Sequence, residues 1–142
     1  MTFNERLSEL LEEKYLSAEA LAKQIGLSGS IVSRWRRKGN VSPKLEHLLR
    51  VAEFFNCSLN FLCGRTEDEN VFNKAAAPKF SERLRQLIKE SKLPVSRVSK
   101  DSNLSRYNFY DWFNGAAPLS SSLCILADYF DCSIDYLVGL ED

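Results

Sequence analysis

Residues 16–43 read LSAEALAKQIGLSGSIVSRWRRKGNVSP, and this stretch decides the fold. Apolar residues recur at intervals of three or four positions on both sides of Gly26, which is typical of two short amphipathic helices. Gly26 can adopt the positive φ that a sharp helix exit requires, and Ser17 and Ser28 can each cap the start of a helix. The stretch therefore predicts two helices joined by a turn.

The flanking residues predict three further helices. Leucines at helical spacing precede the stretch, Ser42 and Pro43 can open a fourth helix with proline in its first turn, and Ser58 can cap a short fifth. The residues expected to face the core from the last two helices are Leu48, Val51, Ala52, Phe55, Leu59 and Leu62. No segment alternates like a strand, so we expect an all-α fold.

The chain also repeats itself. A shift of 77 places superimposes residues 3–35 on 80–112 with eleven identical residues, including Phe3, Leu7 and Trp35. A shift of 75 places then superimposes residues 43–64 on 118–139 with eight more. A repeat this long predicts two similar five-helix domains.

A polar segment separates the two copies. Residues 66–70 read TEDEN, and Pro78 follows three alanines, so the helical periodicity is broken between the copies. We therefore expect a helix-turn-helix domain over residues 1–64, a linker over 65–79 and a second domain over 80–142.

The segment from Leu16 to Pro43 resembles the helix-turn-helix domain of the Cro and lambda-repressor (XRE-type) family. The shared pattern is Leu-Ser-x-x-x-Leu-Ala-x-x-x-Gly-Leu-Ser-x-x-x-Val-Ser-x-Trp-x-x-x-Gly. The resemblance implies a recognition helix from Ser28 to Lys38 that enters the major groove of double-stranded DNA, with Val32 and Trp35 facing the core. The base-facing positions it implies are Gly29, Ser30, Ser33 and Arg34. The phosphate contacts it implies are Ser17, Arg36, Arg37, Lys38, Asn40 and Lys44.

Charge is unevenly distributed along the chain. Its formal net charge is zero, but residues 34–44 carry five positive charges and no negative one. Such a patch can bind phosphate even where the total charge is balanced. Arg34 is the strongest single candidate, because a guanidinium can donate two hydrogen bonds to guanine.

The second copy carries a different set of side chains at the same positions. Its expected DNA contacts are Arg97, Ser105, Arg106, Tyr107, Tyr110 and Asn114. No lysine or arginine follows Arg106, and an aspartate such as Asp111 disfavours phosphate. We therefore expect the second copy to bind DNA more weakly, to mediate self-association, or both, with a homodimer as one outcome.

Other classes of function have less support. There is no phosphate-binding glycine loop and only one histidine, so we expect neither an enzyme nor a cofactor or small-molecule ligand. The four cysteines lack the spacing of a zinc site, and we expect them to pack as small buried residues. Neither an export signal nor a membrane span is evident, which favours the cytoplasm. The remaining alternatives are a repressor-like transcriptional regulator and a protein-interaction adaptor built on the same fold.

Overall fold

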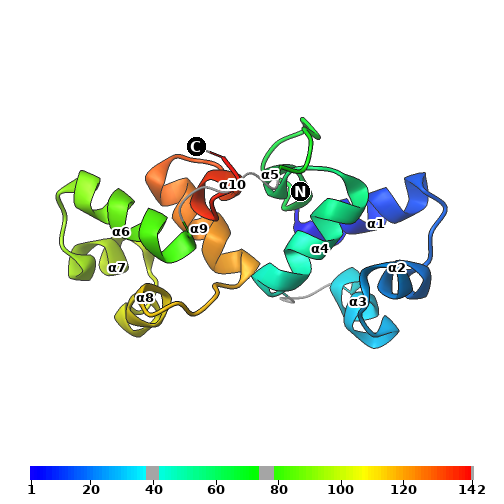
Figure 1. Cartoon of the computed structure of the whole chain (residues 1–142), viewed down its shortest axis with the longest axis horizontal. Coiled ribbons are helices and arrows are strands. Elements are labelled where there is room, and N and C mark those ends of the chain that lie inside the picture. The colour runs from blue at the N-terminus through cyan, green and yellow to red at the C-terminus, as the bar shows by residue number, and fades with distance from the viewer. Residues whose placement is uncertain (38–41, 74–78, 142) are drawn as a thin grey trace. The chain divides into compact units, whose positions relative to one another are not determined.

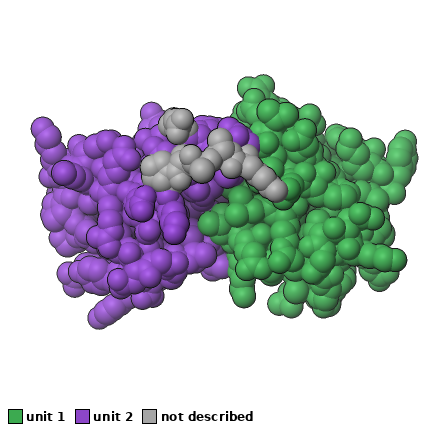
Figure 2. Space-filling view, viewed as in Figure 1, with its two compact units in different colours: residues 1–72 green, residues 73–142 purple. Residues whose placement is uncertain are grey.

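The computed structural model describes residues 1–37, 42–73 and 79–141, and within these ranges it contains ten helices and no strand (Figure 1). This confirms the all-α fold class for the described residues. None of the helices found there is long and apolar enough to cross a membrane. The chain divides into two compact units, residues 1–72 and 73–142 (Figure 2).

Unit 1 contains five helices, several of which are capped at their starts by local side chains. The helices are α1 (Phe3–Glu13), α2 (Ala18–Ile25), α3 (Gly29–Arg36), α4 (Leu45–Phe55) and α5 (Leu59–Leu62). The Ser17 hydroxyl accepts a hydrogen bond from the Ala20 amide at 3.0 Å, and the Ser58 hydroxyl accepts one from the Phe61 amide at 3.0 Å. Gly26 ends α2 with a φ of +74°, the left-handed conformation predicted for it. Ser28 precedes α3 but makes no side-chain cap bond.

The core of unit 1 joins all five helices. Each helix contributes at least one side chain that solvent barely reaches: Leu7 and Leu11, Leu21 and Ala22, Val32 and Trp35, Leu48 and Val51, Leu59 and Leu62. Ile25 and Phe55 are only half-buried. Periodicity therefore predicted the buried face of each helix but not how completely its edges are covered.

The start of α4 differs from the prediction. The helix begins at Leu45 with Lys44 as its N-cap, so Pro43 lies before the cap and not in the first turn. Pro43 is buried and lines a hollow with Trp35. The backbone at Lys44 is still extended, with φ −66° and ψ 152°, and α4 can start only after it.

Helix α3 ends at Arg36, and the backbone of Arg37 is already extended with φ −73° and ψ 146°, so the helix is shorter than the predicted Ser28 to Lys38. Lys38 and Gly39 lie outside the described residues.

A buried arginine fixes the chain that follows α5. The guanidinium of Arg6 is 1% exposed and donates hydrogen bonds to the carbonyl oxygens of Phe61 and Thr66, each at 2.9 Å. It also lies 3.9 Å from the centre of the Phe61 ring. Further along, the Phe72 amide donates to the Asn56 side chain at 3.2 Å. Residues 65–72, predicted as the first half of a linker, thus pack on unit 1, and 74–78 lie outside the described residues.

Unit 2 repeats the order of these helices with closely similar lengths. Its elements are α6 (Phe80–Ser91), α7 (Val95–Ser102), α8 (Arg106–Phe113), α9 (Ser120–Phe130) and α10 (Ile134–Leu137). Arg83, which aligns with Arg6, is 4% exposed, lies 3.8 Å from the centre of the Tyr136 ring and donates to the Glu141 carbonyl oxygen at 3.0 Å. A buried arginine that lies against an aromatic ring and donates to a carbonyl oxygen therefore occurs in both units.

The cysteines follow the prediction only in part. Cys57 and Cys63 are buried in unit 1, as expected of small apolar side chains. Cys124 and Cys132 of unit 2 are half-buried. Cys132 aligns with Cys57, so equivalent positions of the repeat differ in solvent exposure.

Candidate nucleic-acid interface

Helix α3 is held to the rest of unit 1 by its inner face. Val32 is fully buried and Trp35 is 3% exposed, with the Trp35 ring 5.8 Å from that of Phe3 and 5.9 Å from that of His47. The Asn4 side chain of α1 donates to the carbonyl oxygen of Trp35 and, at 3.2 Å, to that of Arg37. These contacts fix the rotation of α3 and therefore decide which of its side chains reach solvent.

The first outward-facing set borders a shallow groove between α2 and α3. The groove measures about 670 Å³, and among its lining residues are the predicted base-facing Gly29, Ser30 and Ser33. Gly29 lies against α2, because a Cβ built on it comes within 3.3 Å of the Glu19 Cγ. Lys23 of α2 lines the same groove and was not predicted from the sequence. The signal that could have found it is its position opposite the buried Leu21 and Ala22 on the helix.

Arg34 lies on the same outward face of α3 as the two serines, but it borders a different hollow. It borders a hollow of about 250 Å³ together with Lys44 of the segment before α4. Both side chains are exposed, and the hollow is floored by Trp35 and Pro43, which are buried. His47 also lines it and is half-buried, but its place beside two cations was not predicted. The predicted base-facing residues therefore lie on one face of α3 and border two different hollows.

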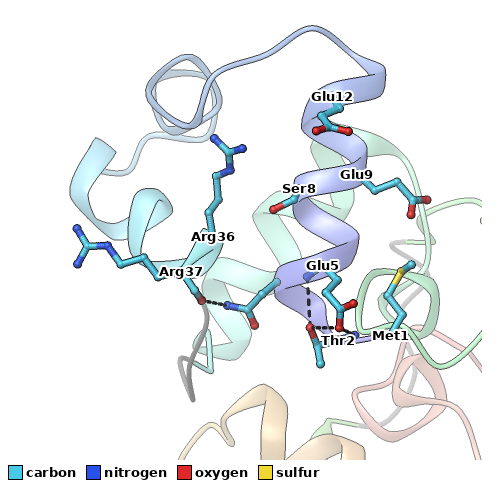
Figure 3. Close-up of a pocket in the computed structure, with 9 residues that line it drawn as sticks. Met1, Thr2, Glu5, Ser8, Glu9, Glu12, Arg36 and Arg37 are labelled. Carbon is cyan, nitrogen blue, oxygen red and sulfur yellow. Dashed lines mark hydrogen bonds between the residues drawn. The ribbon is translucent and has the colours of Figure 1, made fainter.

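Arg36 lies on the α1 side of α3. It lines a hollow of about 790 Å³ whose other walls include Glu5, Glu9 and Glu12 of α1 (Figure 3). Figure 3 shows Arg36 running beside α1 and Arg37 pointing away from it. Arg37 lines the same hollow and also borders the groove that Ser30 and Ser33 line.

The remaining candidates of unit 1 have separate environments. Ser17 is exposed at the start of α2, but its hydroxyl already accepts the Ala20 amide. Lys38 and Asn40 lie outside the described residues.

In unit 2, the outward face of α8 is aromatic. Tyr107 is 80% exposed and Tyr110 is 50% exposed, where unit 1 has Ser30 and Ser33. Ser105 caps the helix by accepting the Tyr107 amide at 3.2 Å, which ties the predicted contact Ser105 to the helix backbone. The other members of this face, Arg106, Asp111 and Asn114, are exposed.

The predicted contact Arg97 is already engaged within unit 2. Its Nε donates to Oδ1 of Asp101 at 3.0 Å, and the other oxygen of Asp101 accepts from the Tyr129 hydroxyl at 3.2 Å. Desolvation and that hydrogen bond to Asp101 raise the pKa of Tyr129 above its ordinary value. The nearby carboxylate reduces the attraction of Arg97 for phosphate.

Phe113 is covered within unit 2. The guanidinium of Arg85 lies 4.6 Å from the centre of its ring and donates to its carbonyl oxygen at 3.0 Å. The aromatic side chains that α8 leaves exposed are therefore the two tyrosines.

One comparison with known proteins bears on unit 1. Residues 7–62 match the family model described as Helix-turn-helix. These residues form a helix-turn-helix domain. The HTH-type transcriptional activator BcrR of Enterococcus faecalis is 34% identical over 67 residues, which are 47% of this chain and 32% of that protein.

The matches cover part of this chain and part of the relative. The chain spans about a third of the length of this relative, and the family match ends at residue 62. No solved structure matches the chain. The resemblance found in the sequence is confirmed for the helix-turn-helix domain of unit 1, and the family of unit 2 stays a prediction.

Proposed function

We propose that the chain is a transcriptional regulator that binds double-stranded DNA in a sequence-specific manner through α3 of unit 1. The observation that carries the proposal is the division of this helix into a buried face, Val32 and Trp35, and an outward face bordered by cations. A helix anchored in this way can enter the major groove without losing core contacts. The match of residues 7–62 to the helix-turn-helix family supports it.

The base contacts that we propose come from Gly29, Ser30, Ser33 and Arg34. Arg34 offers two parallel N–H donors to the O6 and N7 atoms of guanine. Ser30 and Ser33 are short, so the backbone of α3 can approach the base edges closely. Ile31, half-buried beside Arg34, can contact a thymine methyl group.

The phosphate contacts that we propose lie around this face. Arg37 at the end of α3 and Lys44 before α4 are exposed, and each could neutralise a phosphate. Lys38 and Asn40 of the connecting segment remain proposed contacts on the basis of the sequence. Ser17 and Arg36 remain weaker candidates, because Ser17 caps a helix and Arg36 lines the α1 side of α3, whereas Arg37 also borders the groove of Ser30 and Ser33.

The direction of regulation is a separate part of the proposal. The relative named above is a transcriptional activator, and the sequence suggested a repressor. Repression requires only that the bound protein cover its site, so repressor-like action follows from DNA binding alone. A reporter gene with the selected site between promoter and start should lose expression when the chain is present. Increased expression would overturn this part only.

Selection from a random DNA library tests the proposal directly. We expect a defined consensus bound with strong salt dependence, because phosphate neutralisation releases counterions. Arg34→Ala should relax the consensus at one base pair while the helicity of the protein is kept. The adaptor alternative predicts no consensus and no salt-sensitive binding, and that outcome would overturn the proposal.

A further inference from the structure

We infer that the outward face of α8 in unit 2 is a contact surface for a second copy of this chain, packed antiparallel across a two-fold axis. The inference goes beyond the proposed function, which concerns unit 1, and it names the partner and the contact for the self-association that the sequence predicts for the second copy. It depends on a comparison of α8 with α3, which occupy the same place in the two copies of the repeat. The repeat aligns each residue of α8 with one of α3 or its flanks.

That comparison shows the outward face changing its chemistry. Where α3 and its flanks carry Ser30, Ser33, Arg34, Arg37 and Lys44, the second copy carries Tyr107, Tyr110, Asp111, Asn114 and Leu119. Three positive charges are thus replaced by one negative charge and two uncharged side chains, and Arg106 in place of Gly29 adds one positive charge, so the face changes from three positive charges to a net charge of zero. The substituted residues are exposed, and Leu119 is 46% exposed. The change removes attraction for phosphate and adds apolar area, as expected of a protein contact.

The remaining charges of this face complement each other across a two-fold axis. Arg106, the first residue of α8, and Asp111, in its second half, are exposed, and within the described ranges neither takes part in an ion pair. A two-fold contact requires that when residue i meets residue j, residue j of the first copy meets residue i of the second. If Arg106 of each copy meets Asp111 of the other copy, the two-fold contact contains two ion pairs.

The spacing along α8 matches that requirement. Tyr107 and Tyr110 lie at equal distances on either side of a point between Asn108 and Phe109, and Arg106 and Asp111 lie one residue further out. If two α8 helices cross antiparallel at this point, Tyr107 meets Tyr110 of the second copy. The same crossing brings Arg106 to Asp111 of the second copy, and the reverse pair forms as well. All four residues fall within one side of the helix at about 100° per residue.

The same geometry fails for α3. Its corresponding positions are Gly29, Ser30, Ser33 and Arg34, so an antiparallel crossing would bring no opposite charges together. Unit 1 is therefore suited to DNA and unit 2 to a copy of itself. One helix face per subunit is a small interface, which predicts a weak dimer that depends on concentration.

Charge-exchange variants of the full chain test the contact by sedimentation equilibrium. The parent should show a monomer–dimer equilibrium, and Arg106→Asp and Asp111→Arg should each weaken the dimer by about tenfold or more, because both attractive pairs become repulsive. An equimolar mixture of the two variants should associate again, since each protomer then offers the charges that the other needs. The doubly exchanged variant should also dimerise.

A second pair of variants and a folding control complete the experiment. Tyr107→Ser and Tyr110→Ser, which copy the residues of unit 1, should together weaken the dimer. Both charge substitutions suit the helix dipole, so circular dichroism should show unchanged helicity. A parent that stays monomeric overturns the inference. So does a dimer that all variants retain, or a mixture of the charge variants that stays monomeric.

DNA binding separates this inference from the proposed function. Asp111→Arg alters no residue expected to contact DNA, and it should bind a DNA fragment that carries one selected site at least as tightly as the parent does. If DNA binding is absent but mixing restores the dimer, only the proposed function fails. If DNA binding is intact and the parent is monomeric, only the dimer fails.

Discussion

Arg34 and Arg36 are two residues apart in α3, yet their surroundings differ. Arg34 borders a hollow with Lys44, whereas Arg36 borders one with carboxylates of α1. We expect Arg34→Ala to weaken binding to the selected site by roughly 1 to 3 kcal/mol, the scale of a lost base contact. Arg36→Ala, which removes the same charge from the same helix, should cost less than about 1 kcal/mol. Anisotropy titrations measure both, and equal losses would contradict the assignment.

Arg6 is the residue on which the stability of unit 1 should depend most visibly. Its guanidinium makes two buried hydrogen bonds to carbonyl oxygens, and bonds to charged groups contribute about 1.5 to 3 kcal/mol each. We expect Arg6→Ala to lower the free energy of unfolding of unit 1 by about 3 kcal/mol, as measured by urea denaturation.

The matched control for Arg6 is Arg83 of unit 2. Arg83 donates to one carbonyl oxygen, and its Nε has no hydrogen-bond partner among the described residues. Arg83→Ala should therefore lower the stability of unit 2 by a smaller amount. If Arg83→Ala lowered the free energy of unfolding more than Arg6→Ala does, the number of hydrogen bonds would not explain how much each arginine stabilises its unit.

At the scale of elements, the turn between α2 and α3 depends on one backbone conformation. Gly26 has a φ of +74°, and the aligned Asn103 has a φ of +59°. A Cβ at Gly26 would meet nothing closer than the Arg50 guanidinium at 3.7 Å. The cost of a substitution therefore comes from the positive φ and not from a steric clash with neighbouring atoms. We expect Gly26→Ala to destabilise unit 1 by about 1 kcal/mol and Gly26→Asn by less. Thermal unfolding compares them, and an asparagine as costly as alanine would refute the explanation.

At the scale of the whole molecule, the chain is organised as two units. Contacts group residues 1–72 and 73–142 separately, and residues up to Phe72 are hydrogen-bonded to unit 1. Limited proteolysis should therefore cut between Phe72 and Lys79, later than the first residues of the predicted linker. Mass spectrometry of the fragments would identify the sites. Early cleavage inside either unit would contradict this organisation.

The two units should also differ in their dependence on salt. Each phosphate that a protein neutralises adds about 0.9 to the logarithmic salt slope. Unit 1 presents Arg34, Arg37 and Lys44 around its face, whereas unit 2 presents Asp111, Asn114 and Leu119 at the same positions. If proteolysis yields folded fragments, the fragment of unit 1 should bind DNA more tightly and with the steeper slope. Equal slopes would indicate that unit 2 contacts DNA as extensively.

The sequence by itself determined the helices, the turn at Gly26 and the internal repeat. These features depend on local preferences and on the spacing of apolar residues, so periodicity alone was enough to place Val32 and Trp35 in the core. The run of positive charges over residues 34–44 was also evident from the sequence, because charge follows directly from residue type. The outward faces of α3 and α8 follow from the same periodicity, because a helix with one face buried must present the opposite face.

Only the tertiary structure decided which neighbour each outward side chain meets. It showed that the predicted base-facing set borders two hollows, placed Arg36 on the α1 side of α3 and brought His47 to the hollow of Arg34. It also showed that Arg6 fixes a segment 60 residues away. Periodicity describes one helix at a time, whereas these contacts depend on how separate helices pack, and packing is set by the shapes and volumes of the whole core.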